Sequence, residues 1–242
     1  MNRQGTGDKT AAINETKEIF KDDPNGIIKM EALPNKTFEI EYHDGSKYTG
    51  ELQNRKKQGK GKLLFPTGET YEGEFEKDYM HGKGVYTTEN LKYEGEWEFG
   101  VQTGEGVEEW KDGSRYSGGF VNGVKDGMGE YKWKDGTEYN GEWKDGQMHG
   151  YGQFLFKNGS VYKGSWVAGK RQGTGELRSK KGQVYNGEFM RDKKHGKGVM
   201  IFVNGSKYVG AFENGKPHGT GRLVQKNGTF VEGLWENGVL LQ

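Results

Sequence analysis

The sequence predicts an all-β protein: an elongated, twisted antiparallel sheet of tandem 23-residue β-hairpin repeats with a short N-terminal extension. Three features predict this fold: a tyrosine that returns at a fixed interval, a glycine two positions later, and a large apolar residue two positions after that. Of the eight steps between copies, one is 22 residues and the others are 23. Self-similarity at such a period is typical of repeat architectures. The recurring position is held by Tyr48, Tyr71, Tyr93, Tyr116, Tyr139, Tyr162, Tyr185, Tyr208 and finally Val231.

One repeat already indicates its own hairpin. In the fifth copy Tyr139, Gly141 and Trp143 alternate with polar residues, which places them on one face of a strand. The glycine leaves room for the flanking rings to fold over it. A G-x-G pair follows and leads into a second strand. The dipeptide that closes most repeats, here Asn158-Gly159, is predicted to be the two-residue turn of the hairpin, because such turns need positive φ.

The repeats divide the chain into two parts. Residues 1–36 lack the repeat and are predicted to be an extension that is partly disordered or forms a short docking helix over Thr10–Lys21. Residues 37–242 form an array of about eight full repeats plus N- and C-terminal half-repeats. The alternating segment Thr37–His43 is expected to be the second strand of the N-terminal half-repeat. The second repeat is one residue short near Asn90, where we expect a local bend.

Composition excludes several classes of protein. Hydrophobic residues make up only 31% of the chain, but 43 residues are glycine and 31 are Tyr, Phe or Trp, so rings packed beside glycines are expected to form the core. The net charge of +1 argues against a nucleic-acid partner, whose binding would need excess Lys and Arg. There is no cysteine for a disulfide or a thiolate metal site. With neither a long apolar run nor a signal peptide, the expected location is cytoplasmic.

The motif Tyr-x-Gly-x-Trp-x-x-Gly-x-x-x-Gly-x-Gly, clearest at Tyr139–Gly152 and Tyr162–Gly175, resembles the MORN (membrane occupation and recognition nexus) repeat. The resemblance covers about 195 of the 242 residues. It implies a single long twisted sheet with a grooved face, in a scaffold at membranes, cytoskeletal structures, cilia or flagella. The sequence departs from the motif in several repeats: Leu52 and Val231 replace rings, and Arg55, Asp78 and Asp192 replace a glycine.

No catalytic, metal or cofactor site is predicted, so the protein is not expected to be an enzyme. Four histidines, His81, His149, His195 and His218, share one position of the repeat. Equivalent positions of neighbouring hairpins lie about 10 Å apart, two strand spacings, which is too far for ligands that must each approach zinc to about 2 Å. The many carboxylates are interpreted as a solvated face. The G-x-G pairs never open a helix, so they are not nucleotide-binding loops.

The pair of residues that precedes each G-x-G segment varies most, and we interpret these pairs as loops along one edge of the sheet. The early pairs predict an apolar, partner-binding ridge of Tyr79, Met80, Val101, Val124 and Met148. The later pairs predict a basic ridge for an anionic partner, made of Lys170, Arg171, Lys193 and Lys194 with Lys197 nearby. Ordinary solvated lysines are the alternative interpretation of the basic residues.

The predicted function is a non-enzymatic scaffold or adaptor. It would hold a partner protein through its groove of rings or its apolar ridge, in a ciliary, flagellar (axonemal) or other cytoskeletal assembly. The alternative is a peripheral membrane module at the cell cortex, whose basic ridge binds anionic phospholipids such as phosphoinositides at about 1 kcal/mol per well-placed cation. The exposed ends of the sheet are open either to a second copy, giving a homodimer, or to a bound partner.

Overall fold

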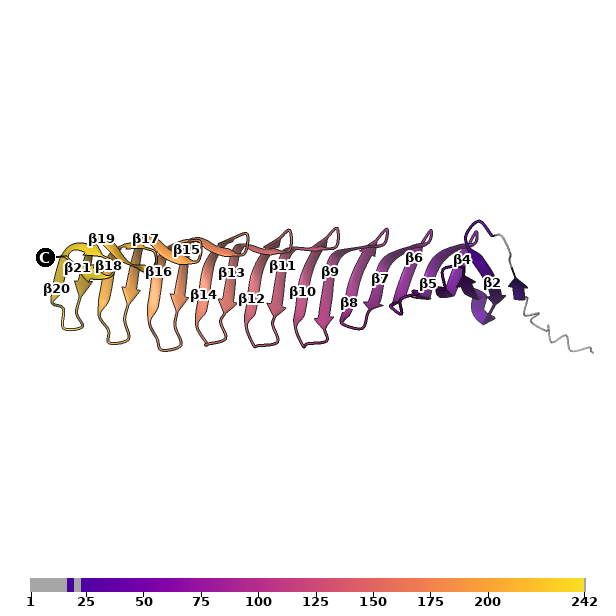
Figure 1. Cartoon of the computed structure of the whole chain (residues 1–242), viewed down its shortest axis with the longest axis horizontal. Coiled ribbons are helices and arrows are strands. Elements are labelled where there is room, and N and C mark those ends of the chain that lie inside the picture. The colour runs from indigo at the N-terminus through magenta and orange to yellow at the C-terminus, as the bar shows by residue number, and fades with distance from the viewer. Residues whose placement is uncertain (1–16, 20–22, 242) are drawn as a thin grey trace, which may run out of the picture. The chain divides into compact units, whose positions relative to one another are not determined.

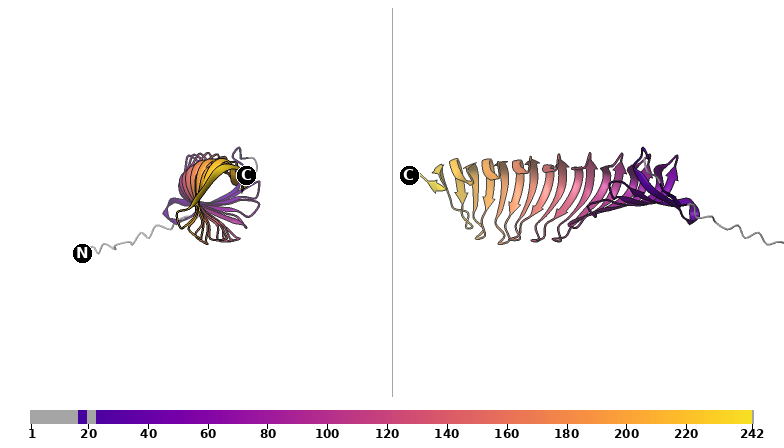
Figure 2. Two further views of the ribbon diagram at one scale, coloured as in Figure 1. Left: turned by 90° about the vertical axis from the view of Figure 1, so that its left-hand side faces the viewer. Right: turned by 45° about the vertical axis from the view of Figure 1, so that its right-hand side comes forward.

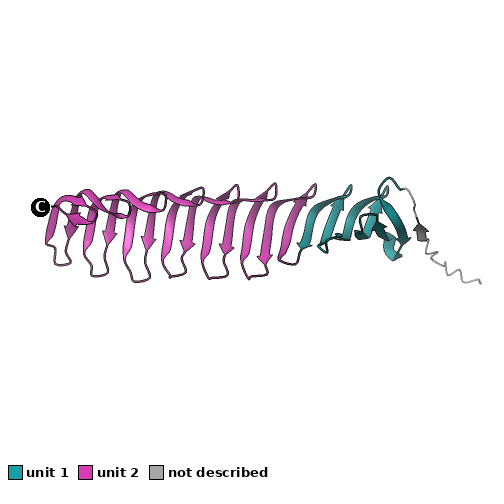
Figure 3. Cartoon of the chain, in the orientation of Figure 1, with its two compact units in different colours: residues 1–88 teal, residues 89–242 magenta. Residues whose placement is uncertain are grey.

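The computed structural model describes residues 17–19 and 23–241, which fall into two compact units. Unit 1 comprises residues 1–88 and unit 2 residues 89–242, coloured separately in Figure 3. The boundary lies in the shortened second repeat. Within each unit consecutive strands pair antiparallel in chain order, so the predicted all-β fold of tandem hairpins is confirmed.

Unit 1 contains seven strands and one 3₁₀ turn. Of the predicted helix Thr10–Lys21, only residues 17–19 are described. These three form a strand that pairs with residues 29–31, so the structure differs from the prediction there, and the rest of that segment lies outside the described residues. The strand predicted at Thr37–His43 is confirmed as β3, although the sheet begins before it, inside the predicted extension. The elements are β1 (Lys17–Ile19), β2 (Ile27–Ala32), η1 (Pro34–Lys36), β3 (Thr37–Tyr42), β4 (Lys47–Gln53), β5 (Lys56–Leu64), β6 (Thr70–Glu76) and β7 (Tyr79–Thr87).

Unit 2 is a meander in which each strand pairs with the next, as the labels in Figure 1 show. Its even-numbered strands carry the Tyr-x-Gly-x-Trp/Phe motif, with Val231 in place of the tyrosine in β20, and are here named first strands. The strands that carry G-x-G are named second strands. The strands are β8 (Leu91–Glu98), β9 (Val101–Trp110), β10 (Arg115–Val121), β11 (Val124–Lys132), β12 (Glu138–Lys144), β13 (Gln147–Leu155), β14 (Val161–Val167), β15 (Lys170–Arg178), β16 (Val184–Met190), β17 (Lys193–Ile201), β18 (Lys207–Glu213), β19 (Lys216–Val224), β20 (Phe230–Glu236) and β21 (Val239–Leu240).

The register separates two faces. In the fifth repeat Tyr139 lies opposite Phe154 and Gly141 opposite Gly152, and β12 alternates strictly between buried and exposed residues after Glu138. We name the face that carries the tyrosines the ring face and the other the polar face. A bulge follows Gly141, and the orange and yellow strands of unit 2 are visibly bowed in the left-hand view of Figure 2. Bulges of this kind bend a strand and increase its twist.

The turn prediction was wrong in detail. The two-residue turns join the first to the second strand of each repeat, as at Asp145 and Gly146, where φ is 49° and 74°. The dipeptide Asn158-Gly159 lies instead in a three-residue loop in which Gly159 N donates to Phe156 O and only the glycine has positive φ. The Asn158 side chain accepts a hydrogen bond from the amide of Ser160. Both loop types favour Asn-Gly, so the dipeptide alone does not distinguish them.

In each unit the core is built on the tyrosines at the recurring position, each at most 1% exposed. Every one lies edge-on to the Trp or Phe of its own repeat wherever that residue is aromatic. Glycines provide the space that these rings fill, so the sheet buries aromatic surface without a second layer. The buried tyrosines are Tyr48, Tyr71, Tyr93, Tyr116, Tyr139, Tyr162, Tyr185 and Tyr208.

Candidate functional site: the ring face of unit 2

Each buried tyrosine donates its hydroxyl to the backbone carbonyl three residues later in its own strand. Tyr139 Oη donates to the backbone carbonyl of Glu142 at 2.9 Å and lies 3.1 Å from that of His149. Its ring is edge-on to Trp143 at 5.3 Å and to Trp166 of the next repeat at 5.5 Å. Burial raises the pKa of the Tyr139 hydroxyl well above its usual value, so it stays a hydrogen-bond donor. The base of the ring face is therefore rigid, which suits a surface that must present other side chains.

Above this row, the second strands of unit 2 and the residues directly after them carry further rings that are only half-buried. Ring centroids are 5.3 Å apart between Trp110 and Tyr131, 4.3 Å between Tyr131 and Trp133, 5.5 Å between Trp133 and Phe154, and 4.7 Å between Phe154 and Phe156. These five side chains, named the ring ladder, come from three successive repeats. Their contacts form one unbroken aromatic track that is partly open to solvent. Tyrosine and tryptophan are the side chains that most often supply binding energy at protein interfaces.

Cations also lie on the ring face, at one position of the repeat. Lys125 Nζ is 4.9 Å from the centroid of the Tyr116 ring and 5.0 Å from that of Trp110, and it forms an ion pair with the buried Glu108. The Arg171 guanidinium lies 5.5 Å from the Phe156 ring, the last member of the ring ladder. Cation–π contacts of this kind are attractive, more so when desolvated. The ring ladder thus has a cation at each end.

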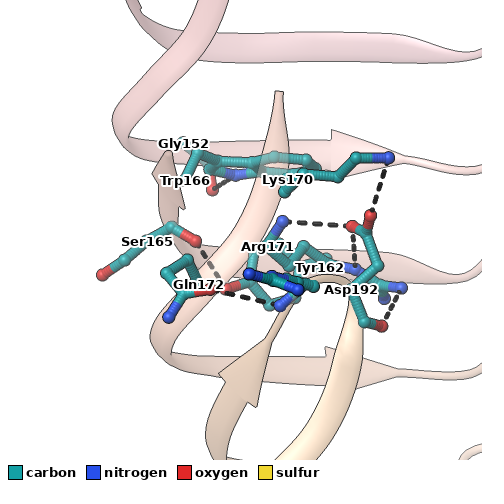
Figure 4. Close-up of polar contacts among 9 residues, drawn as sticks. Gly152, Tyr162, Ser165, Trp166, Lys170, Arg171, Gln172 and Asp192 are labelled. Atoms are coloured by element: carbon teal, nitrogen blue, oxygen red, sulfur yellow. Dashed lines mark hydrogen bonds and ion pairs between the residues drawn. The ribbon is translucent and has the colours of Figure 1, made fainter. Parts of the chain in front are cut away.

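Arg171 is held by an aspartate from the following repeat. Its Nε is 3.3 Å from Asp192 Oδ1 and its Nη2 donates to the Asp192 carbonyl at 2.7 Å. Asp192 also accepts a hydrogen bond from the backbone amide of Arg171, as Asp78 in unit 1 does from that of Lys57. Figure 4 shows the Asp192 carboxylate between the side chains of Lys170 and Arg171. These aspartates were visible in the sequence as replacements of a turn glycine, but their role depends on the packing of adjacent repeats.

The predicted apolar ridge is divided between the two faces. The paired residues are not loop tips: they are the first two residues of a second strand, so their side chains point in opposite directions. Tyr79 in unit 1 is 54% exposed, and Val101 and Val124 in unit 2 are each 43% exposed, all on the polar face. Met80 and Met148 lie opposite core rings on the ring face and are half-buried.

The predicted basic ridge is divided for the same reason. Lys170, Lys193 and Lys197 are exposed on the polar face, where Lys170 Nζ lies 3.4 Å from Asp192 Oδ2. Arg171 and Lys194 lie opposite Trp166 and Phe189 on the ring face and are half-buried. The edge-loop interpretation is therefore corrected: three cations share the polar face and two share the ring face.

Sequence reasoning also missed a recurring glutamate three residues after the tyrosine. In the fifth repeat Glu142 Oε1 accepts a hydrogen bond from the amide of Tyr151 at 2.8 Å, next to Gly150 with φ of 54°. The carboxylate therefore caps the bulge that bends the second strand. The alternation of this position between Glu and small residues was the available signal, as at Gly119 and Ser165.

In the part of the chain that the structure describes, no group of three His, Asp or Glu side chains is arranged to hold a metal ion. Over residues 17–19 and 23–241, no helix has the length and apolar character needed to cross a bilayer.

Comparison with solved structures finds matches at low identity and low TM-score. The TCP10 domain of Danio rerio CPAP in complex with a peptide of Danio rerio STIL has a TM-score of 0.46 at 13% identity, covering 85% of this chain and 98% of that one. The Drosophila melanogaster SAS-4 (dCPAP) TCP domain with a proline-rich motif of Ana2 has a TM-score of 0.27 at 15% identity, covering 88% and 99%. Because these TM-scores are low, the likeness carries no conclusion about what this chain binds.

Comparison with curated proteins finds no match. The MORN repeat, in contrast, matches eight consecutive stretches that cover most of the chain: residues 48–70, 71–90, 93–115, 116–138, 139–161, 162–184, 185–207 and 208–230. Each match begins at the core tyrosine position, and two residues separate the end of the second match, at residue 90, from the start of the third, at the shortened repeat. The chain belongs to the MORN-repeat family.

Proposed function

We propose that the protein is a non-enzymatic scaffold that holds a segment of a partner protein against the ring face of unit 2. The observation that carries this proposal is the ring ladder, five aromatic side chains in mutual contact that stay half-buried on the ring face. Amphipathic rings on a rigid base lose little conformational entropy on binding, which favours affinity.

The regular spacing of the repeats also favours a partner segment in an extended conformation. Equivalent positions recur every two strands, about 9.6 Å apart, and the same side-chain pattern continues from one repeat to the next. A partner segment that lies along the array would meet one set of rings per repeat and gain contact area in proportion to its length. The ladder would supply the central, desolvated contacts and the surrounding polar residues the rim.

The experiment compares affinity purification of the wild-type chain with two variants. Trp133→Ala combined with Phe154→Ala removes the middle of the ring ladder without touching the core tyrosines. Tyr151→Ala is the matched control, because this ring is 62% exposed on the polar face of the same strand as Phe154. We expect quantitative mass spectrometry to show partner proteins lost with the ladder variant and retained with the control. Equal retention by both variants would contradict the proposal.

The cellular setting remains a prediction that rests on the family: a ciliary, flagellar or other cytoskeletal assembly, with the membrane cortex second. Detergent extraction of the source cells tests it. Retention in the insoluble cytoskeletal fraction together with defined protein neighbours supports the scaffold, whereas release into the detergent phase favours the cortex.

The second proposal is peripheral binding to anionic lipid, and the observation that favours it is that Lys170, Lys193 and Lys197 share the exposed polar face. Their attraction to headgroups would be screened by salt. Vesicles containing phosphatidylserine and a phosphoinositide should co-sediment with the wild-type chain at low salt, and less with all three lysines changed to Glu. Binding that is indifferent to both salt and these changes would contradict it.

Self-association is the remaining prediction for the array ends. In unit 2, β21 pairs with Trp235 and Glu236 of β20, and Phe230, Val231 and Leu234 are about half exposed. A partly open strand edge beside apolar side chains is a template for pairing with a second copy. Sedimentation analysis over a range of concentrations distinguishes a homodimer from a monomer.

A further inference from the structure

Lys194 is the exception among the ring-face cations. Lys57 lies 4.0 Å from Asp78, Lys125 pairs with Glu108, and Arg171 pairs with Asp192. Lys194 Nζ contacts the Met200 thioether at 3.9 Å and lies 5.2 Å from the Tyr185 ring centroid, but in residues 23–241 it has no carboxylate at ion-pair distance. A half-buried ammonium loses solvation, and in the described residues only the Met200 thioether and the Tyr185 ring offset that loss, without a carboxylate.

Both sources of a carboxylate at the other positions are absent here. The turn residue that is Asp78 for Lys57 and Asp192 for Arg171 is Gly215 for Lys194, and Gly215 only donates its amide to the Lys194 carbonyl. The residue opposite the core tyrosine, which is Glu108 beside Lys125, is Leu177 beside Lys194. Lys194 therefore lacks a counter-charge because neither neighbouring repeat supplies one: the repeat before it has Leu177 and the repeat after it has Gly215.

The surroundings of Lys194 add to this imbalance. Burial lowers the pKa of the Lys194 ammonium, and the positive charge of Arg171 lowers it further. An anion placed beside Lys194 would offset both effects by stabilising the charged ammonium. Arg171 also connects this position to the ring ladder, because its guanidinium packs over Phe156. One continuous surface thus runs from the ladder through Arg171 to Lys194.

We infer that Lys194 receives an acidic side chain of the partner segment that lies in the ring ladder, and that Arg171 strengthens the attraction. This inference rests on the proposed function and specifies its ligand: an extended segment with aromatic or aliphatic anchors followed by Asp or Glu. Phe154 and Lys194 belong to repeats five and seven, about four strand spacings or ~19 Å apart. An extended chain covers that distance in about six residues.

The test is a display selection of random 14-residue peptides on the full chain, with three variants. Lys194→Met removes the charge, and Met80 and Met148 show that methionine is accommodated at this position of the repeat. Lys193→Met is the matched control, because it removes the same charge from the adjacent residue on the polar face. Trp133→Ala interrupts the ring ladder.

We expect wild type and Lys193→Met to select peptides with Asp or Glu five to seven residues from an aromatic or aliphatic anchor. Lys194→Met should lose the acidic preference and retain the anchor. One selected peptide should bind Lys194→Met about tenfold more weakly, as for loss of one charge-assisted hydrogen bond. Changing its acidic residue to the amide should weaken binding to wild type but not to Lys194→Met.

The outcomes separate the two proposals. If Trp133→Ala leaves the selected peptides unchanged, the ring ladder is not the site and the proposed function fails. If Trp133→Ala abolishes selection but wild type shows no acidic preference, or Lys194→Met keeps it, the inference about Lys194 is wrong and the ladder stands. If no peptide is selected, and vesicles containing phosphatidylserine bind wild type but not Lys194→Met, the anion is a lipid headgroup and the inference is overturned.

Discussion

The substitution Gly152→Ala tests most directly how the sheet is held together. Gly152 has ordinary extended backbone, so alanine creates no φ strain there. Its Cβ would instead lie 2.4 Å from Tyr139 Oη and 2.5 Å from Cε2, where ordinary contact begins at 3.4 Å. The ring must therefore move by about 1 Å, away from the carbonyl of Glu142 and from its two tryptophan neighbours.

The expected cost follows from those contacts. Loss of the buried hydroxyl's hydrogen bond costs about 1–3 kcal/mol. Weakening each of the two edge-on ring contacts costs about 0.5–1.5 kcal/mol. Replacing glycine by alanine in an extended strand returns about 0.4–1 kcal/mol through the unfolded state. We therefore expect Gly152→Ala to lower the free energy of unfolding by about 3 kcal/mol, centred within those ranges.

The assay is urea unfolding followed by tryptophan fluorescence, with hydrogen exchange over β12–β14 to detect local opening, since repeat arrays need not unfold in two states. Gly136→Ala is the control: φ there is 84° but no atom lies within 4 Å of its Cβ position, so only backbone strain of about 1–2 kcal/mol is expected. In a Tyr139→Leu background the cost of Gly152→Ala should fall below about 1 kcal/mol, because the ring is gone. An equal cost in both backgrounds would refute the reasoning.

Three further predictions concern the core and the bulge. Burial raises the pKa of Tyr71 and Tyr162 to about 12. The unfolded chain loses these protons first, near pH 10, so the free energy of unfolding should fall between pH 10 and 12 by about 1.4 kcal/mol per pH unit for each such tyrosine. Denaturant titration at several pH values measures this fall. Glu108→Leu should cost about 3 kcal/mol by leaving Lys125 unpaired among rings, and adding Lys125→Met should restore most of it; a single variant as stable as the double would contradict this. Glu142→Ala should cost about 1 kcal/mol and speed hydrogen exchange at the adjacent bulge amide, and unchanged exchange would exclude the proposed cap.

The alternating pattern made the strands and the ring face predictable. In a strand, side chains two apart share a face whatever the surroundings, so Tyr139, Gly141 and Trp143 could be placed together from sequence. The same rule applied to Lys170 and Arg171 would have separated them, had those residues been recognised as the start of a strand. The error lay in assigning the loop, because the Asn-Gly dipeptide suits both turns of the repeat.

Interactions between repeats were not predictable in this way. The pairs Lys125 with Glu108 and Arg171 with Asp192 join residues 17 and 21 positions apart, from different repeats. They depend on how one hairpin packs against the next, and hence on the bulge that follows the glycine of each first strand. Neither the Asn-Gly dipeptide nor the 23-residue period indicates that bulge. The sequence showed where aspartates replace glycines, but not that their carboxylates reach back to the preceding repeat.

By itself the sequence determined the family, the hairpin repeat, the strands and the side of the sheet on which the rings gather, because each follows from spacing along the chain. Only the tertiary structure decided which half-buried rings touch, which cations lie among them and which cation lacks a counter-charge. Those properties depend on distances between side chains of neighbouring repeats, set by strand register and by the bend at each bulge. A period along the chain records that two repeats are alike, whereas the packed sheet determines which of their differing side chains meet.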